Sequence, residues 1–259
     1  MRIALVTGAT AGFGLAICRT LMQAGYNVIG TGRRAERLHA LQTEFGEQFL
    51  PLAFDITDPK QTEQALQSRP NKWQSVDLLI NNAGLALGLE PAYQVELEDW
   101  YQMIDTNIKG AVTLTRLILP EMMAKNHGHI INLGSIAGNY AYPGGNVYGA
   151  TKAFMKQFSL NLRADLSGTK IRVTNLEPGL CGGTEFSTIR FKGDQAKADK
   201  VYENVEFVRP EEIADIVLWL NQQPEHVNIN RLEVMPTAQS FSPLSVYREN
   251  GEISAIFAK

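Results

Sequence analysis

The stretch Ile3–Gly14 reads "IALVTGATAGFG" and joins an apolar run to a turn rich in glycine. The run Ile3–Val6 has the composition of a buried strand, and an amphipathic segment follows the turn through Ala24. Glycines in the spacing Gly-x3-Gly-x-Gly allow a tight turn and let a phosphate approach backbone N–H groups at a helix N-terminus. A purely structural turn is the alternative, but the position directly after an apolar strand favours a dinucleotide site.

Short apolar runs alternate with helical patterns along the rest of the chain. Helical spacing is present in 33–45, 57–70, Asp99–Lys125, the segment that begins near Tyr148, and Pro210–Asn221. Fully apolar strands indicate a sheet covered on both faces, and the alternation with helices predicts that the strands are parallel. The sequence therefore predicts an α/β fold of the Rossmann type, with a doubly wound parallel sheet, three layers and a single domain over 1–259. The expected strands are Ile3–Val6, Asn27–Thr31, Phe49–Asp55, Val76–Asn81, His129–Gly134, Lys170–Leu176 and Arg231–Met235.

Two regions depart from this alternation. Residues 179–208 form a long polar insertion that contains glycine, and we interpret it as a lid over the substrate. Residues 240–259 form a C-terminal tail without a clear period.

Composition excludes several classes of function. The 259 residues carry a net charge of −3, so no strong basic field indicates nucleic acid or an anionic membrane as a partner. No apolar run reaches the length of a membrane span. The four histidines form no metal-ligand pattern, and no metal is predicted. Two cysteines far apart, Cys18 and Cys181, and an N-terminus without a signal-peptide layout predict a cytoplasmic location.

The second predicted strand ends in "VIGTGRR", which places two arginines where an open α/β sheet usually contacts the adenosine ribose. An acidic residue at that position suits a free 2′-hydroxyl, whereas arginine suits a 2′-phosphate. Arg33 and Arg34 can grip a phosphate bidentately, and a solvated charge pair is the alternative. The pair therefore predicts NADP rather than NAD as the cofactor.

The stretch "NVYGATKAF" places Tyr148 four residues before Lys152 in a helical segment. Residues four apart share a helix face, so the ammonium group lies within reach of the phenol. A nearby cation favours the phenolate and lowers the pKa of the tyrosine, which would let Tyr148 move protons near neutral pH. An ordinary surface pair at helical spacing is the alternative, and the rest of the chain decides between the two.

Seven motifs in order give the chain its resemblance to the classical short-chain dehydrogenase/reductase family. They are "TGATAGFG" at 7–14, "FDIT" at 54–57, "NNAG" at 81–84, "DTNIKG" at 105–110, "INLGSIAG" at 131–138, "YGATK" at 148–152 and "EPGL" at 177–180. Within the family, "GGTEFSTIRFKGD" and "HVNINRLEVMP" resemble the NADP-dependent 3-hydroxy acid dehydrogenases, which include serine and allo-threonine dehydrogenases and malonic semialdehyde reductases. The resemblance extends from about Ile3 to Pro236.

The resemblance implies roles for four residues. Tyr148 would be the general acid in reduction and the general base in oxidation, and Lys152 would lower the tyrosine pKa and bind the nicotinamide ribose. Ser135 would fix the substrate carbonyl, with a hydrogen bonder at a strand end as the alternative. Asn107 would hold a water in a proton relay, with a brace for a helix kink as the alternative.

The resemblance also implies a cofactor site. Asp55 and Ile56 would flank the adenine, Asn82 would pass the ribose, and Thr184 would bind the carboxamide or a phosphate. The predicted cofactor-binding set is Gly8, Ala9, Thr10, Ala11, Gly12, Phe13, Gly14, Arg33, Arg34, Asp55, Ile56, Asn82, Tyr148, Lys152, Pro178, Gly179, Leu180, Thr184 and Phe186.

A hydroxy acid needs a counter-charge, and Arg190 in the 179–208 insertion is the candidate, beside Ser135 and Tyr148 as substrate-binding residues. Solvent exposure, or a contact with NADP phosphate, is the alternative for Arg190. Gly182 and Gly183 would serve as a hinge. The resemblance further implies a homotetramer.

Rival functions are a 3-oxoacyl or bulky-ketone reductase of the same fold, a non-catalytic NADP-binding regulator, and a scaffold. A regulator would be expected to lose the tyrosine or the lysine, and a scaffold does not explain Arg33 and Arg34 beside the glycine turn.

Overall fold

The computed structural model describes residues 2–240, 245–247 and 253–255. Its central feature is a seven-stranded parallel sheet with the strand order β3-β2-β1-β4-β5-β6-β7. The strands are β1 (Ile3–Thr7), β2 (Asn27–Gly32), β3 (Phe49–Ala53), β4 (Leu78–Asn81), β5 (Gly128–Leu133), β6 (Ile171–Pro178) and β7 (Arg231–Val234). The chain winds outward from β1 in one direction and then from β4 in the other, which confirms the predicted doubly wound parallel sheet.

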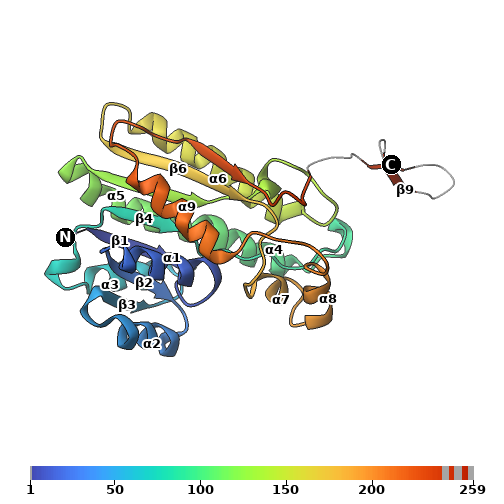
Figure 1. Ribbon diagram of the computed structural model, residues 1–259, viewed down its shortest axis with the longest axis horizontal. Helices are drawn as coiled ribbons and strands as arrows, with labels where there is room; N and C mark the ends of the chain where they lie inside the picture. The colour runs from blue at the N-terminus through green and yellow to red at the C-terminus, as the bar shows by residue number, and fades with distance from the viewer. Residues whose placement is uncertain (1, 241–244, 248–252, 256–259) are drawn as a thin grey trace.

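Helices cover both faces of the sheet, so the fold has three layers. Contacts are dense between α1 and α9, which lie side by side on one face (Figure 1). The helices are α1 (Gly12–Gln23), α2 (Ala35–Phe45), α3 (Pro59–Gln67), α4 (Leu97–Ile104), α5 (Ala111–Lys125), α6 (Asn146–Asp165), α7 (Phe186–Arg190), α8 (Gln195–Lys200) and α9 (Pro210–Gln222). Short 3-10 turns lie at η1 (Gly46–Gln48), η2 (Asn71–Trp73), η3 (Ala92–Gln94) and η5 (Ile136–Gly138).

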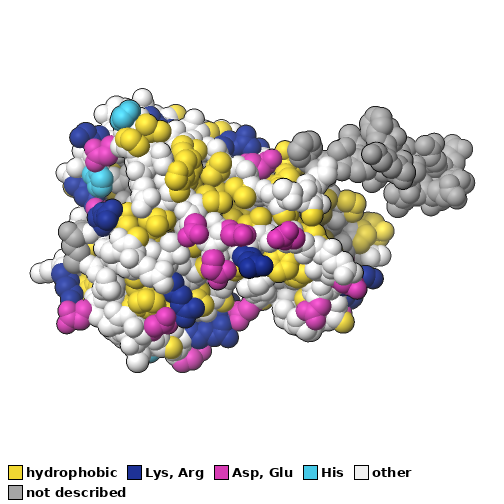
Figure 2. Space-filling model, viewed as in Figure 1, with side chains coloured by type: hydrophobic (Ala, Val, Ile, Leu, Met, Phe, Trp, Pro, Cys, Tyr) yellow, Lys and Arg dark blue, Asp and Glu magenta, His cyan; other side chains and the backbone are white. Residues whose placement is uncertain are grey.

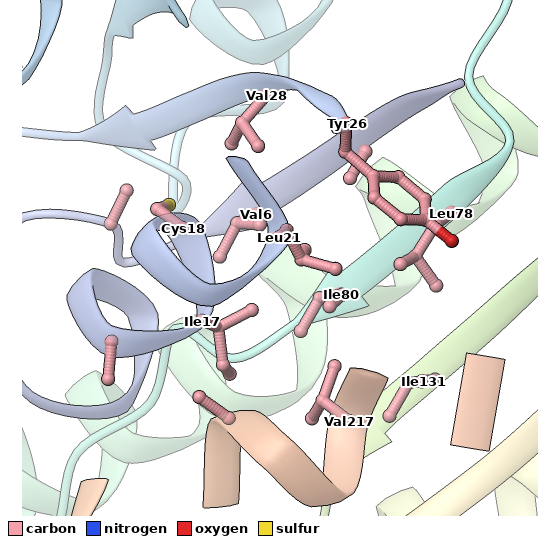
Figure 3. Close-up of a cluster of buried hydrophobic side chains, with 14 of the residues drawn as sticks. Val6, Ile17, Cys18, Leu21, Tyr26, Val28, Leu78, Ile80, Ile131 and Val217 are labelled. Atoms are coloured by element: carbon pink, nitrogen blue, oxygen red, sulfur yellow. The ribbon is translucent and has the colours of Figure 1, made fainter. Parts of the chain in front are cut away.

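Alternation along the strands divides the core into two halves. Ala4 and Val6 of β1 point to one side and pack with residues of α1, α2 and α9. Figure 3 shows Ile17 and Leu21 of α1 and Val217 of α9 turned toward this side of the sheet. Ile3 and Leu5 point to the other side, among residues of α3, α5 and α6. Because both sides are buried, the strand reads as a continuous apolar run in the sequence.

The predicted helix over Asp99–Lys125 is one continuous helical stretch with a change of geometry in its middle. Between α4 and α5 the segment η4 (Asp105–Gly110) is a π-helix. Such wide turns occur frequently at functional sites. The predicted strand boundaries differ from the observed ones by one or two residues. For example, β3 ends at Ala53, so Asp55 lies just beyond the strand rather than in it.

Acidic, basic and apolar side chains are interspersed on the face shown in Figure 2, as the small net charge of −3 suggests. Within the part of the chain that the structure describes, no helix has the length and apolar character to cross a membrane.

The 179–208 segment, which joins β6 to α9, contains the short helices α7 and α8. Hydrogen bonds close its base: the N–H of Gly182 donates to Val208 O at 3.1 Å, and the N–H of Val208 donates to Leu180 O at 3.1 Å. Of the predicted tail, the structure describes Ser240 and two short antiparallel strands, β8 (Ser245–Tyr247) and β9 (Ile253–Ala255). The rest of that prediction lies outside the described residues.

Candidate functional site

A cleft of about 1160 Å³ opens at the carboxyl ends of the strands. It lies where the strand order reverses between β1 and β4, which is the place where open α/β sheets bind ligands. Its walls come from the glycine turn, the ends of β2 and β3, the loop after β5, the start of α6 and the 179–208 segment.

Most of the predicted site residues line this one cleft, although they come from all parts of the chain. They are Gly8, Thr10, Ala11, Gly12, Phe13, Arg33, Arg34, Asp55, Ile56, Asn82, Ser135, Tyr148, Lys152, Pro178, Gly179, Leu180, Thr184, Phe186 and Arg190. Three predicted residues lie behind the wall instead. Ala9 is fully buried in the core, Gly14 lies at the start of α1, and Asn107 is buried beside the cleft.

The glycine turn has the geometry of an anion cradle. Gly8 and Gly12 adopt positive φ angles of 68° and 51°, which side-chain-bearing residues rarely adopt. A Cβ on Gly14 would overlap the carbonyl oxygen of Gly8. The first turn of α1 contains no acidic residue, and its cap residue Ala11 accepts no hydrogen bond through its side chain. The N–H groups at this helix end therefore suit a phosphate.

Cationic side chains gather at the end of β2. Arg34 donates from Nε and Nη2 to Thr10 Oγ1, at 3.2 and 2.9 Å. Its Nη1 atom lies 2.8 Å from Oε2 of Glu185, and Arg37 Nη1 lies 2.8 Å from Oε1 of the same carboxylate. Desolvation acts to raise the pKa of Glu185, but the hydrogen bonds from Arg37 and Arg34 outweigh it and lower the pKa. Arg33, which is exposed, lines the cleft beside them.

Tyr148 lies at the start of α6 and is 8% exposed. Burial raises the pKa of Tyr148 to about 12, against a hydrogen bond with Ser135 and the charge of Arg190, which both lower it. Ser135 caps η5 through its side chain, which accepts from the N–H of Ala137 at 3.1 Å, and its hydroxyl donates to Pro178 O at 3.3 Å. The two hydroxyls therefore meet in one polar corner of the cleft.

The structure corrects the predicted effect of Lys152 on the tyrosine. Lys152 Nζ lies 5.8 Å from the centroid of the Tyr148 ring and donates to Leu133 O at 2.7 Å. Burial lowers the pKa of Lys152 to about 8. In the chain by itself the pKa of Tyr148 is raised, not lowered, because desolvation outweighs the lowering effects of Ser135 and of the Arg190 charge. The helical spacing places the pair correctly, but the spacing contains no information about burial.

Asn107 braces the wall of the cleft. Its Oδ1 atom accepts from the N–H of Leu85 at 2.8 Å, while Nδ2 donates to Leu85 O at 2.8 Å and to Thr151 Oγ1 at 3.1 Å. Both amide hydrogens are thus in use, and the side chain connects the loop after β4 to α6 inside the π-helical turn. These contacts are those of the brace, the alternative left open by the sequence, and the role in a relay stays a prediction.

Arg190 lies over the corner of the cleft that holds Tyr148. Its guanidinium carbon is 5.6 Å from the centroid of the Tyr148 ring. Nη2 donates to Tyr142 Oη at 2.9 Å, and Nε donates to Gly88 O at 3.2 Å. Phe186 of the same short helix packs its ring 5.8 Å from that of Tyr148. Arg190 is therefore held in place by two loops rather than lying free in solvent.

Sequence reasoning missed three residues of this site: Arg37, Glu185 and Tyr142. Arg37 follows Arg34 by one helical turn, a spacing that could have identified it. Glu185 and Tyr142 act through partners that are distant in the sequence, and no local pattern marks them. Among the described residues, no group of three or more His, Cys, Asp or Glu side chains could hold a metal ion.

This arrangement of turn, sheet and polar corner is that of a known class of proteins. The chain belongs to the short-chain dehydrogenase family, because the model of that family, described as "short chain dehydrogenase", matches residues 2–194. The family resemblance drawn from the seven motifs is confirmed.

Individual relatives are close. A "Probable NADP-dependent dehydrogenase" of Haemophilus influenzae is 71% identical over 246 residues, which cover 95% of this chain and 98% of that protein. The "NADP-dependent 3-hydroxy acid dehydrogenase YdfG" of Escherichia coli K12 is 56% identical, over 95% of this chain and 100% of that one. A solved structure described as "The Closed form of serine dehydrogenase complexed with NADP+" superposes with a TM-score of 0.94 at 56% identity, covering 95% of this chain and 100% of the other.

Proposed function

We propose that this chain is an NADP-dependent oxidoreductase that transfers hydride between NADP(H) and short 3-hydroxy acids such as 3-hydroxypropionate, L-serine and L-allo-threonine. One observation carries the proposal: a fixed guanidinium, that of Arg190, lies 5.6 Å from the Tyr148 ring in the same cleft as Ser135 and Lys152. A residue that can transfer a proton and a cation that can bind a carboxylate thus face one space. The names of the close relatives support the same substrate class.

The residues at the adenosine end fit NADP. The uncapped start of α1 suits the pyrophosphate, and Arg33 and Arg34 suit the 2′-phosphate. Asp55 accepts from Thr57 through Oδ1, at 2.9 and 2.8 Å, which orients the carboxylate at the cleft wall where we propose that the adenine binds. Asn82, Ile56, Thr184 and Phe186 are the further proposed contacts, together with Pro178, Gly179 and Leu180. When bound, the nicotinamide supplies the hydride chemistry that no side chain can perform.

Tyr148 would transfer the proton. In the oxidative direction its phenolate takes the proton of the substrate hydroxyl, and in reduction its phenol returns a proton to the carbonyl oxygen. In the chain by itself burial raises the pKa of Tyr148 to about 12, so the phenol is protonated at neutral pH and suits proton donation in reduction; in oxidation, the positive charge of the oxidised nicotinamide would favour the phenolate. Lys152 and Arg190 are the cations that face the ring. Ser135, whose hydroxyl acts to lower the pKa of the phenol, would hold the reacting oxygen in line.

Arg190 would bind the substrate carboxylate. Among the hydrogen bonds of the described residues it uses Nε and Nη2, which leaves Nη1 for a ligand. Charge-assisted bonds from a preoriented guanidinium discriminate strongly for a carboxylate. A carrier-bound or bulky ketone would instead have to pass this fixed cation, which disfavours the rival reductases.

Three further features belong to the same proposal. Residues 179–208 would act as a lid that excludes water, with Gly183, at a φ of 70°, as part of its hinge. A homotetramer is supported by exposed apolar side chains on α4, where Leu97 and Tyr101 are 49% and 56% exposed. Light scattering at several concentrations would test it. The two cysteines are unpaired, which fits a reducing cytoplasm.

The decisive experiment is steady-state oxidation of 3-hydroxypropionate, L-serine and L-allo-threonine, each with NADP and with NAD. We expect turnover with NADP, and a loss of about 100-fold to 10,000-fold in kcat in Tyr148→Phe, the usual range for general acid–base catalysis. The matched control is Tyr93→Phe, because Tyr93 is 84% exposed.

Different failures would mean different things. If none of the three acids turns over while NADP still binds, the proposed substrate class is wrong and 3-oxoacyl and bulky ketones become the next substrates to test. If Tyr148→Phe keeps full activity, the proposed proton transfer is wrong. A preference for NAD would refute the role assigned to Arg33 and Arg34.

A further inference from the structure

Glu185 connects the two ends of the cleft. It immediately precedes α7, which carries Phe186 and Arg190 over Tyr148, and its carboxylate reaches back to Arg34 and Arg37 at the start of α2. These contacts join residues 151 and 148 positions apart in the chain. A single carboxylate therefore lies between the part of the cleft that faces the substrate and the part proposed to bind the cofactor phosphate.

The carboxylate occupies donors that a phosphate would need. Arg34 directs Nε and Nη2 to Thr10, and its remaining terminal nitrogen, Nη1, donates to Glu185 at 2.8 Å. Arg37 Nη1 also donates to Glu185, at 2.8 Å. A phosphate at this position would meet two guanidiniums that already have an anionic partner, and it would lie close to that negative charge.

We propose that Glu185 is a specificity-determining residue that competes with the 2′-phosphate of the cofactor for Arg34 and Arg37. This inference rests on the proposed function. A carboxylate at the ribose end is also the group that accepts a hydrogen bond from a free 2′-hydroxyl. Glu185 therefore weakens the binding of NADP, supports the binding of NAD, and narrows the preference between the two cofactors.

The ion pairs of Glu185 with Arg34 and Arg37 can be replaced by other partners. The side chains of Glu185, Arg34 and Arg37 are 41%, 37% and 47% exposed, so solvent can replace either partner. Glu185 makes no side-chain capping bond to α7, so the helix does not depend on its carboxylate. Gly183, two residues earlier, has a φ of 70° and gives the backbone a place to turn.

The test is calorimetric titration of the full chain with adenosine 2′,5′-bisphosphate and with adenosine 5′-monophosphate, which differ only in the 2′-phosphate. In Glu185→Gln we expect the first ligand to bind about threefold to tenfold more tightly, as for the loss of a competing half-exposed ion pair. The affinity for the second should stay equal or fall. The ratio of kcat/KM with NADP to that with NAD should rise by a similar factor.

A matched control separates this local effect from the general loss of a negative charge. Glu44 pairs with Arg19 at 3.0 Å, the two side chains are 44% and 47% exposed, and neither residue lines the cleft. Glu44→Gln should leave both ligand affinities unchanged. Glu185→Ala serves as a second variant, and its ratio of kcat/KM with NADP to kcat/KM with NAD should also rise.

The outcomes decide between distinct ideas. Weaker binding of the bisphosphate in both Glu185 variants would overturn the proposal, because Glu185 would then hold the arginines in place for the phosphate. Equal tightening of both ligands would also overturn it, as a nonspecific charge effect. If the wild-type chain does not prefer the bisphosphate, the proposed use of NADP fails as well, whereas a wild-type preference that the variants leave unchanged refutes only the role of Glu185.

Discussion

The floor of the cleft and the 179–208 segment above it are built in different ways. On the floor, Lys152 and Asn107 are 8% and 3% exposed, and both bond to backbone atoms of neighbouring elements. The segment is held at Arg190 by Gly88 and Tyr142, but its other charged contacts are ion pairs with at least one exposed partner. Glu185 meets Arg34 and Arg37, and Lys192 Nζ meets Asp99 Oδ2 at 2.7 Å.

This difference indicates how stability is distributed. Buried polar groups that lose a partner are costly, so the floor keeps a single geometry and preorganises the catalytic corner. Exposed ion pairs contribute only about 0.2 to 1 kcal/mol each, so these ion pairs of the segment can separate at small cost. We expect substitutions on the floor to affect folding and substitutions in the segment to affect ligand binding.

The largest effect should come from Gly14→Ala, at the start of α1. The added Cβ would overlap the Gly8 carbonyl oxygen, a backbone atom that cannot move aside without opening the turn. We expect a loss of about 3 kcal/mol in the free energy of unfolding, at the upper end for overpacking. Urea denaturation measures it. Gly25→Ala is the control, because nothing lies within 4 Å of its Cβ and only its φ of 83° is unfavourable. Equal losses in both variants would contradict the steric argument.

The second prediction concerns pH and Lys152. Its pKa is about 8 in the folded chain against an ordinary 10.5, because burial disfavours the ammonium. Between these values the unfolded chain holds the proton that the folded chain has released, so stability rises with pH. Relative to Lys152→Met, the wild type should gain about 2 kcal/mol in free energy of unfolding from pH 7 to pH 10. Parallel urea titrations of the two proteins at each pH would reveal this gain. If the difference between their free energies of unfolding stays constant with pH, the lysine stays charged in the folded chain.

The difference between features set by neighbours in the chain and features set by distant segments explains what could be predicted from the sequence. The runs at Ile3–Val6 and Val76–Asn81 identify buried strands because their pattern depends only on neighbours in the chain. The turn residues Gly8 and Gly12 are also local, since their positive φ angles require glycine. For this reason the sheet was predicted correctly, and the residues predicted from the glycine turn and from the family resemblance lie for the most part along one cleft.

The remaining features depend on contacts between distant segments. In the π-helical turn at Asp105–Gly110, Asn107 bonds to Leu85 and Thr151, contacts that no local pattern encodes. The raised pKa of Tyr148 follows from burial, which helical spacing does not reveal. The pair of Glu185 with Arg34 requires the segment to fold back over the turn.

The third prediction tests the segment at its substrate end. Arg190→Ala should raise the KM for 3-hydroxypropionate about tenfold to thirtyfold, as for one lost charge-assisted bond, with little change for a neutral alcohol of similar size. Arg190→Lys keeps the charge but not the planar set of N–H donors, so its KM for 3-hydroxypropionate should lie between those of the wild type and Arg190→Ala. Steady-state kinetics on both substrates provides the comparison, and an equal rise on both would show that Arg190 supports the cleft wall rather than the carboxylate.

The smallest effect should come from Lys192, which lies in the 179–208 segment, whereas Lys152 lies on the floor of the cleft. Its pKa is raised, chiefly by the hydrogen bond to Asp99, so its contribution to stability is present below the ordinary pKa of 10.5 and is lost only at higher pH. Lys192→Met keeps a Cβ at the φ of 51°, so the backbone cost is unchanged and only the ion pair is removed. At pH 7 in low salt we expect Lys192→Met to lose about 0.5 kcal/mol in the free energy of unfolding. Relative to this variant, the wild type should gain no stability toward pH 10, and in 1 M NaCl the two proteins should be almost equally stable. Urea titrations in the two salts measure it, with Lys192→Arg as the variant that keeps the charge. A loss above about 2 kcal/mol, far beyond what a pair with one exposed partner contributes, would mean that the segment is held as firmly as the floor, and the distinction between the two regions would fail.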